Sequence, residues 1–240
     1  KIFLTCLVIV HHVANGWHII LSVQAAQQGS QMDPSSAAWF FVFGNFNQSY
    51  FMSLFFFFSG YFSPRSLNKK GTYMFLFDKL KRLGIPLIIT LYLWHPFAEE
   101  GMSYLIGQNP EFSQKLVGEG VAWFVQQLIL FNIVYAFACG EGWAPKIKCP
   151  SLLSFFGMSL LLALLAALLS LFFPPAPAYF FTVPLFWIYY PSYIVFFFGG
   201  ALAQVNNWMD EIKDKSRLVI YAWAIICIAI GATVSLFGME

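Results

Sequence analysis

This chain contains few charged residues. Only 10% of its 240 residues are charged, whereas 59% are hydrophobic and 20% are aromatic. This composition excludes an ordinary soluble domain, in which about a quarter of the residues are charged. The formal net charge of +2 is also too small to indicate a nucleic-acid partner. The composition therefore predicts a protein that lies in a lipid bilayer.

Cysteine is scarce as well, and its four copies show no paired spacing. Cys6 and Cys227 fall inside apolar runs, where a thiol is typical of core packing. Nothing in this spacing indicates a disulfide framework or a cluster of metal ligands. We therefore expect no metal site.

Apolar segments recur along the whole chain and are long enough to cross a bilayer. We predict an all-α polytopic membrane protein with about seven transmembrane helices, in a single domain over residues 1–240. The predicted spans are Ile2–Val23, Phe40–Phe62, Leu83–Phe97, Val121–Cys139, Leu152–Phe173, Leu185–Val205 and Leu218–Phe237. Because the chain starts at Lys1 without methionine and stops at Glu240, we expect it to be truncated at both ends.

Lysine and arginine are missing from two of the predicted loops, and their distribution orients the chain. The loops after the first and fifth spans contain neither, and the loop after the third contains one, Lys115, among glutamates. The loops after the second, fourth and sixth spans contain two or more lysines and arginines each, and residues 63–82 contain the most. By the positive-inside rule, which counts only lysine and arginine, these loops and the N-terminus are cytoplasmic. This orientation suits a multi-pass protein of a plasma or inner membrane.

The N-terminal span carries the first candidate site. An apolar run from Ile2 to Val10 separates Lys1 from the pair His11 and His12. In a helix, Lys1 and His12 share one face, with His12 about 16 Å deeper along the axis. That depth is near the middle of a hydrocarbon core about 30 Å thick, where an ionisable side chain is a functional candidate. His11 points about 100° away, toward a different neighbour.

Two interpretations of His12 stay open. It is either a neutral imidazole that hydrogen-bonds a neighbouring helix, or a general base that takes a proton from a hydroxyl group. His11 is either structural or an orienting partner of His12. A signal peptide is the alternative for the whole span, but the two histidines and Asn15-Gly16 after the apolar run argue against that pattern.

Two further polar groups accompany the histidines. Lys79 and Arg82 are three residues apart, hence neighbours on one helical face, and their cations suit phosphate groups. The alternative for them is a topology anchor that contacts anionic lipid head groups. Asn47 and Gln48 lie in a polar stretch of the second span, where they either hold helices together or line a polar cavity.

Together these residues resemble the acyltransferase type 3 family of membrane proteins. Lys1 and His12 match its Arg/Lys-x10-His signature, and further motifs follow in the family's order. These motifs are Phe58-Ser59-Gly60-Tyr61, Lys79-x-x-Arg82-Leu with Pro86, Trp123-Phe124, and Pro191-Ser-Tyr193-Ile with Phe197-Phe-Gly199. Asn47-Gln48 followed by Tyr50-Phe-Met52 is most similar to the branch of glucan-modifying succinyltransferases.

The resemblance implies an O-acyltransferase that moves an acetyl or succinyl group from cytoplasmic acyl-coenzyme A to a hydroxyl of a carbohydrate or glycan. It implies that the catalytic histidine is His12, beside His11. The expected donor-binding residues are Lys1, Lys79 and Arg82, and the expected substrate-binding residues are Asn47, Gln48 and Trp123. Lys1 and Lys79 stand where the family more usually has arginine, which cannot be replaced by lysine in a bidentate phosphate contact. The family commonly has about ten spans, so some three further helices are expected.

Two other classes of function use the same features. A secondary transporter could use a histidine inside the membrane to relay protons or bind substrate. A non-catalytic membrane scaffold would tolerate the replacement of His12 by glutamine. Dependence on acyl-coenzyme A separates the acyltransferase from both alternatives.

Overall fold

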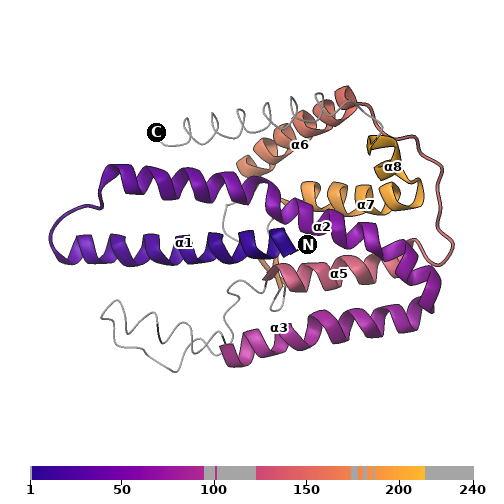
Figure 1. Ribbon diagram of the computed structural model, residues 1–240, viewed down its shortest axis with the longest axis horizontal. Helices are drawn as coiled ribbons and strands as arrows, with labels where there is room; N and C mark the ends of the chain where they lie inside the picture. Colours follow the sequence, from indigo (N-terminus) through magenta and orange to yellow (C-terminus); the bar gives the residue numbers. More distant parts are fainter. Residues whose placement is uncertain are drawn as a thin grey trace. The chain divides into compact units, whose positions relative to one another are not determined.

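The structure is a computed structural model in which the described residues are 2–94, 101, 123–173, 178–180, 183–185 and 187–213. Apart from loops and one short two-stranded ribbon, these residues are helical (Figure 1). The chain divides into two compact units. Among the described residues, the first unit includes 2–52 and the second includes 53–94, 123–173 and 187–213.

Two helices make up most of the described part of the first unit. They are α1 (Ile2–Gln27) and the beginning of α2 (Pro34–Lys79), and they run side by side (Figure 1). Asp33 caps α2 by accepting the Ser36 N–H at 3.0 Å. Hydrogen bonds from the Ser35 hydroxyl and from Ser36 lower the pKa of the Asp33 carboxyl. The helical hairpin thus has a defined turn between its two helices.

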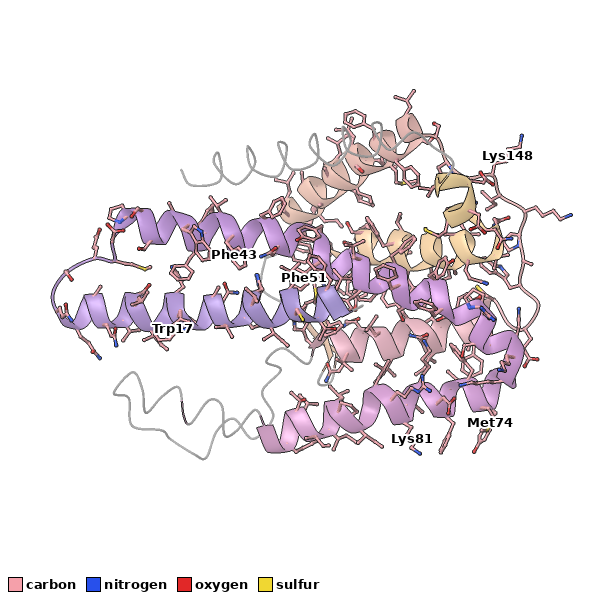
Figure 2. All side chains as sticks on the ribbon, in the orientation of Figure 1. Trp17, Phe43, Phe51, Met74, Lys81 and Lys148 are labelled. Atoms are coloured by element: carbon pink, nitrogen blue, oxygen red, sulfur yellow. The ribbon has the colours of Figure 1, made fainter. Side chains whose placement is uncertain are left out.

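α1 packs on α2 through one face. It is long and apolar enough to cross a membrane from Phe3 to Gln27, which extends the first predicted span by about one turn. Its buried side chains are Leu4, His11 and Ala14, which recur at helical spacing. Trp17 lies on the side of α1 that points away from α2 (Figure 2).

In the second unit, α2 consists of two helices joined at Gly71. There φ is 75° and ψ is 163°, a conformation that only glycine adopts without strain. The Glu141 carboxylate accepts the N–H of Thr72 at 2.9 Å and its hydroxyl at 3.2 Å, and so caps the helix that starts after the break. Asn68 accepts the Gly142 N–H at 2.8 Å. The loop at 141–142 therefore holds both sides of the break.

The helix that follows Gly71 continues past Lys79 through η1 (Leu80–Gly84), α3 (Ile85–Ile89) and η2 (Thr90–Trp94). The segments η1 and η2 are π-helical turns. Pro86 follows η1. Proline has no N–H to donate and its ring crowds the preceding turn of a helix, and the wider π-helical turn relieves this crowding. The third predicted span begins at Leu83, whereas the helix already begins after Gly71, inside the basic loop. Residues 95–97 of that span lie outside the described residues.

The other helices of the second unit are α5 (Trp123–Ala138), α6 (Leu152–Phe172), α7 (Tyr190–Val205) and the short α8 (Trp208–Lys213). Of these, α5 and α6 agree closely with predicted spans, whereas α8 lies in the loop that was predicted after the sixth span. By length and composition, α6 could cross a membrane, whereas α5 and α7 are apolar but shorter. Ser151 caps α6 by accepting the Ser154 N–H at 3.2 Å.

The sixth predicted span is wrong at its start. Leu185 belongs to β2 (Val183–Leu185), which pairs antiparallel with β1 (Ala178–Phe180). Pro184 lies in β2, and a proline at this point cannot continue a helix interior. α7 starts later, at Tyr190, with a proline in its first turn. Proline is tolerated there because the N–H groups of the first turn make no hydrogen bond within the helix.

The predicted helical class holds for the described residues, with the ribbon as its exception. Among these residues, two helices pass as candidate membrane spans, α1 and α6. The seven spans therefore stay a prediction, and the seventh, Leu218–Phe237, lies outside the described residues.

α2 and α7 meet backbone to backbone in the second unit. A Cβ atom added at Gly60 would lie 1.8 Å from the carbonyl oxygen of Phe197, and one added at Gly200 would lie 2.1 Å from that of Phe57. Around Gly199, in contrast, no atom of another described element lies within 4 Å of an added Cβ. Small residues at such crossings let membrane helices approach closely, and here Gly60 and Gly200 have that role.

Aromatic side chains fill the space beside this crossing. The rings of Phe56 on α2 and Tyr193 on α7 stack with centroids 4.4 Å apart. Phe131 on α5 lies 5.0 Å from Phe56 and 5.3 Å from Phe197. These rings join α2, α5 and α7 into one core.

Candidate active site

α1 places its two neighbouring histidines in different surroundings. His11 is only 4% exposed, whereas His12 is exposed. The difference follows from the rotation of about 100° per residue in a helix. The two rings still touch edge to face, with centroids 5.4 Å apart. Lys1 lies outside the described residues, so the face that it shares with His12 stays a prediction.

Both helices of the first unit hold the His11 ring. Asn15, one turn along α1, places its amide nitrogen 3.0 Å from His11 Nε2. Because an amide nitrogen only donates, Nε2 accepts, and the neutral ring carries its proton on Nδ1. From α2, the rings of Phe51 and Phe43 lie 5.1 Å and 6.5 Å from the imidazole (Figure 2). No role in the site was predicted for Asn15 from the sequence, although its four-residue spacing from His11 is a usable signal.

Asn47 lies between Phe43 and Phe51 on the same face of α2, one turn from each. It is 2% exposed, and its Oδ1 accepts from the Tyr50 hydroxyl at 3.1 Å. In the described part of the chain, neither Asn47 Nδ2 nor His11 Nδ1 has a hydrogen-bond partner, although both atoms are buried. The side chain of Gln48 is not among those described.

Lys79 directs its ammonium group into the second unit. The side chain is half-buried, and Nζ lies 3.4 Å from Ser63 Oγ, to which it donates. The same nitrogen lies 5.1 Å from the centroid of the Phe75 ring, a cation–π contact. Arg82, in the π-helical turn η1, is exposed. The two cations that were predicted as a pair therefore have different surroundings.

A chain of hydrogen bonds supports the position of Lys79. The Ser63 hydroxyl donates to Asn132 Oδ1 at 2.8 Å, and Asn132 Nδ2 donates to Ser59 Oγ at 3.1 Å and to the Leu128 carbonyl at 2.6 Å. Ser63 and Asn132 are fully buried. Such a network fixes geometry when its members are satisfied. No role was predicted for Asn132 from the sequence, although a lone asparagine in the apolar helix α5 is a usable signal.

The surface beside Lys79 is basic. Lys70 forms an ion pair with Asp78, and Lys81 and Arg82 follow on the next turn. The hydrogen bond from Lys70, together with the positive charges of Lys70, Arg82 and Lys81, lowers the pKa of the Asp78 carboxyl. Lys81 points away from the helices of the unit (Figure 2). A surface of this kind attracts anions.

Trp123 is the first residue of α5 and lies far from Lys79. Its ring lies 6.2 Å from that of Tyr193 on α7, and one turn later Gln127 accepts from the Tyr190 hydroxyl. Asn132 is a further five residues along α5, so Trp123 is about 14 Å along the helix axis from the network that supports Lys79. The structure therefore does not bring Trp123 together with Lys79.

The candidate residues thus form two groups. His11, His12 and Asn47 belong to the first unit, and Lys79, Arg82 and Trp123 to the second. Among the described residues there is no group of three or more His, Cys, Asp or Glu side chains that could hold a metal ion. The first group offers an exposed imidazole and buried donors for proton transfer and hydrogen bonding. The second offers cations for an anionic ligand.

The model of a family described as an acyltransferase domain matches residues 1–239, nearly the whole chain. Neither a curated protein nor a solved structure matches the chain at a significant level. The family match agrees with the motifs on α1, α2, α5 and α7. The protein is therefore a member of the acyltransferase type 3 family, a membrane-embedded acyltransferase.

Proposed function

We propose that the protein transfers an acetyl or succinyl group from acyl-coenzyme A to a hydroxyl group of a carbohydrate or glycan, with His12 as the general base. The observation that carries this role is the exposure of His12 on a helix long and apolar enough to cross a bilayer. An exposed imidazole can be reached by a substrate hydroxyl. The buried His11, in contrast, has one ring nitrogen bonded to Asn15.

In the proposed reaction, the acceptor hydroxyl oxygen attacks the carbonyl carbon of the thioester. Its proton passes to the His12 imidazole, the C–S bond breaks, and the imidazolium returns the proton to the departing sulfur of coenzyme A. A site inside the membrane excludes water, which limits hydrolysis of the thioester. His12 therefore acts as base in the first half of the reaction and as acid in the second.

The basic groups have the role of donor binding in this proposal. The phosphates of coenzyme A would contact Lys1, Lys79 and Arg82 from the cytoplasmic side. Contacts to the substrate would come from Asn47, Gln48 and Trp123. The aromatic ring of Trp123 suits the apolar face of a sugar. The similarity of residues 47–52 to the glucan-modifying branch favours succinyl as the acyl group and a glucan as the acceptor.

A transfer assay tests this function directly. Membranes that contain the protein are incubated with acetyl- or succinyl-coenzyme A labelled in the acyl group, and the label is followed into carbohydrate. We expect label in the glycan fraction only when the protein is present. Label that stays in coenzyme A or appears only as free acid would contradict the proposal.

We further propose seven membrane spans in one domain, with the N-terminus in the cytoplasm. Single cysteines at positions 69 and 146 are then expected to be protected from an impermeant thiol reagent in intact cells, and cysteines at 111 and 176 to be labelled. Lys69 and Lys146 are both exposed in the structure, so protection there reports the side of the membrane and not burial. The four native cysteines are replaced first. Labelling at position 69 from outside would reverse the orientation.

Replacing Arg82 by alanine is expected to raise the apparent KM for the acyl donor and to leave kcat nearly unchanged. A charge-assisted contact to a phosphate contributes about 1.5–3 kcal/mol, which corresponds to a rise in KM of about tenfold to a hundredfold. Lys81→Ala is the matched control, because Lys81 is an equally exposed cation in the same turn that points away from the unit (Figure 2). An unchanged donor KM in correctly inserted Arg82→Ala protein would leave the basic loop with its role as topology anchor alone.

A further inference from the structure

α1 and α2 each carry one buried hydrogen-bond donor that has no partner among the described residues. His11 Nδ1 and Asn47 Nδ2 belong to side chains that are 4% and 2% exposed, and neither atom has a partner in the described part of the chain. A buried donor without a partner destabilises the folded state, because it has lost its hydrogen bond to water. Two such donors, one on each of two packed helices, call for a group that can accept hydrogen bonds from them.

The helix geometry places these two donors opposite each other. Asn47 is one turn from both Phe43 and Phe51 on one face of α2. The His11 ring packs against those same two phenylalanine rings, with centroids 6.5 Å and 5.1 Å away. The imidazole therefore faces the part of α2 from which Asn47 projects.

The hydrogen bonds already made by each side chain fix what remains. Asn15 donates to His11 Nε2, so the proton of the neutral ring is on Nδ1. The Tyr50 hydroxyl donates to Asn47 Oδ1, so Asn47 is left with the N–H groups of Nδ2. Both free positions are donors, and the group that satisfies them must be an acceptor, with a preference for negative charge.

We propose that His11 and Asn47 together bind the carbonyl oxygen of the acyl thioester and stabilise the negative charge that develops on it. This inference rests on the proposed function of His12, whose ring centroid lies 5.4 Å from that of His11. The acceptor hydroxyl lies at His12, and the carbonyl that it attacks lies between His12 and the two donors. Asn15 and Tyr50 are positioning residues that orient the donors.

The step balances as follows. The hydroxyl oxygen forms a bond to the carbonyl carbon, its proton passes to His12, and the π electrons of the carbonyl move onto its oxygen. His11 Nδ1–H and the Asn47 amide donate to this oxyanion. When the C=O bond re-forms, the C–S bond breaks, and the proton on His12 passes to the sulfur of coenzyme A. Donors placed for the oxyanion stabilise the transition state more than the ground state.

The test uses His11→Phe and Asn47→Leu in the full chain in membranes. Phenylalanine keeps a ring against Phe43 and Phe51, and leucine is close in size to asparagine, so each variant removes donors with little change in packing. We expect kcat to fall by about 10²–10³-fold in each, with a nearly unchanged donor KM. Ser22→Ala is the matched control on α1, since it removes only the hydrogen bonds of the Ser22 hydroxyl to the His18 carbonyl and the Met32 sulfur, and full activity is expected.

A second measurement separates this role from a structural one. Each protein is assayed with an acyl-coenzyme A and with its dithioester analogue, in which sulfur, a poor hydrogen-bond acceptor, replaces the carbonyl oxygen. The ratio of the two kcat/KM values does not depend on how much protein is folded. We expect the preference for oxygen over sulfur to fall at least tenfold in both variants relative to the wild type.

Each outcome decides one question. A preference for oxygen that is unchanged in both variants would overturn the inference, whether kcat falls or not. A rise confined to the KM of the carbohydrate would also overturn it, because it would assign the donors to the acceptor hydroxyl. Loss of transfer in His12→Ala alongside such a result would leave the proposed function standing. If the wild type transfers no label from acyl-coenzyme A, or His12→Ala keeps the full rate, the proposed function itself fails.

Discussion

Replacing His12 by alanine is expected to lower the rate of acyl transfer by about 10²–10⁴-fold, the range that a positioned general base contributes. The side chain is exposed on α1, so its removal leaves the packing of α1 on α2 in place and the thermal stability nearly unchanged. The measurement is transfer of label from acyl-coenzyme A in membranes at matched expression, with thermal stability followed on the same preparations.

His18→Ala is the matched control for this prediction. His18 lies on the same helix, and its ring packs 5.6 Å from that of Phe40, away from the His11–His12 pair. Full activity is expected in this variant because it removes an imidazole without touching the proposed site. A His12→Ala protein as active as His18→Ala would show that the base lies elsewhere. Loss of stability together with loss of rate would instead favour the structural interpretation of His12.

The helices themselves could largely be predicted from the sequence. α6 follows its apolar run almost residue by residue, because a run of that length needs no distant partner to be recognised. The break at Gly71 could not be predicted in this way. A glycine between Lys70 and Thr72 is compatible with a continuous helix, and the break depends on a cap from Glu141, which lies 69 residues away in the sequence. The β1–β2 ribbon likewise depends on pairing between two short segments.

The candidate site could also be predicted only where it depends on residues close together in the sequence. The different surroundings of His11 and His12 follow from helix geometry alone, whereas which of them is buried depends on the position of α2. The role of Asn132 depends on Ser59 and Ser63, more than 60 residues away in the sequence. A polar residue in an apolar segment can be recognised from the sequence as costly to bury, but its hydrogen-bond partners can be identified only from the packing of the helices.

Replacing Gly200 by alanine is expected to destabilise the second unit by about 1–3 kcal/mol or more, the range for an overpacked core. The added Cβ would lie 2.1 Å from the carbonyl oxygen of Phe57 and 2.9 Å from the N atom of Tyr61. These are backbone atoms of α2, which cannot rotate away as a side chain does, so α2 and α7 must separate. The measurement is thermal unfolding of the purified protein in detergent, compared with wild type.

Gly199→Ala provides a control on the adjacent residue of the same helix. It has no neighbour within 4 Å of the added Cβ, and alanine is favoured over glycine in a helix by about 1 kcal/mol, so this variant is expected to be as stable as the wild type or more so. Because both variants gain the same helix propensity, the difference between them isolates the steric cost of the crossing. Gly60→Ala meets the Phe197 carbonyl at 1.8 Å and should resemble Gly200→Ala. Since one separation of α2 from α7 relieves both clashes, the double variant should lose less stability than the two single losses added together. Equal stability of Gly199→Ala and Gly200→Ala would contradict the close crossing.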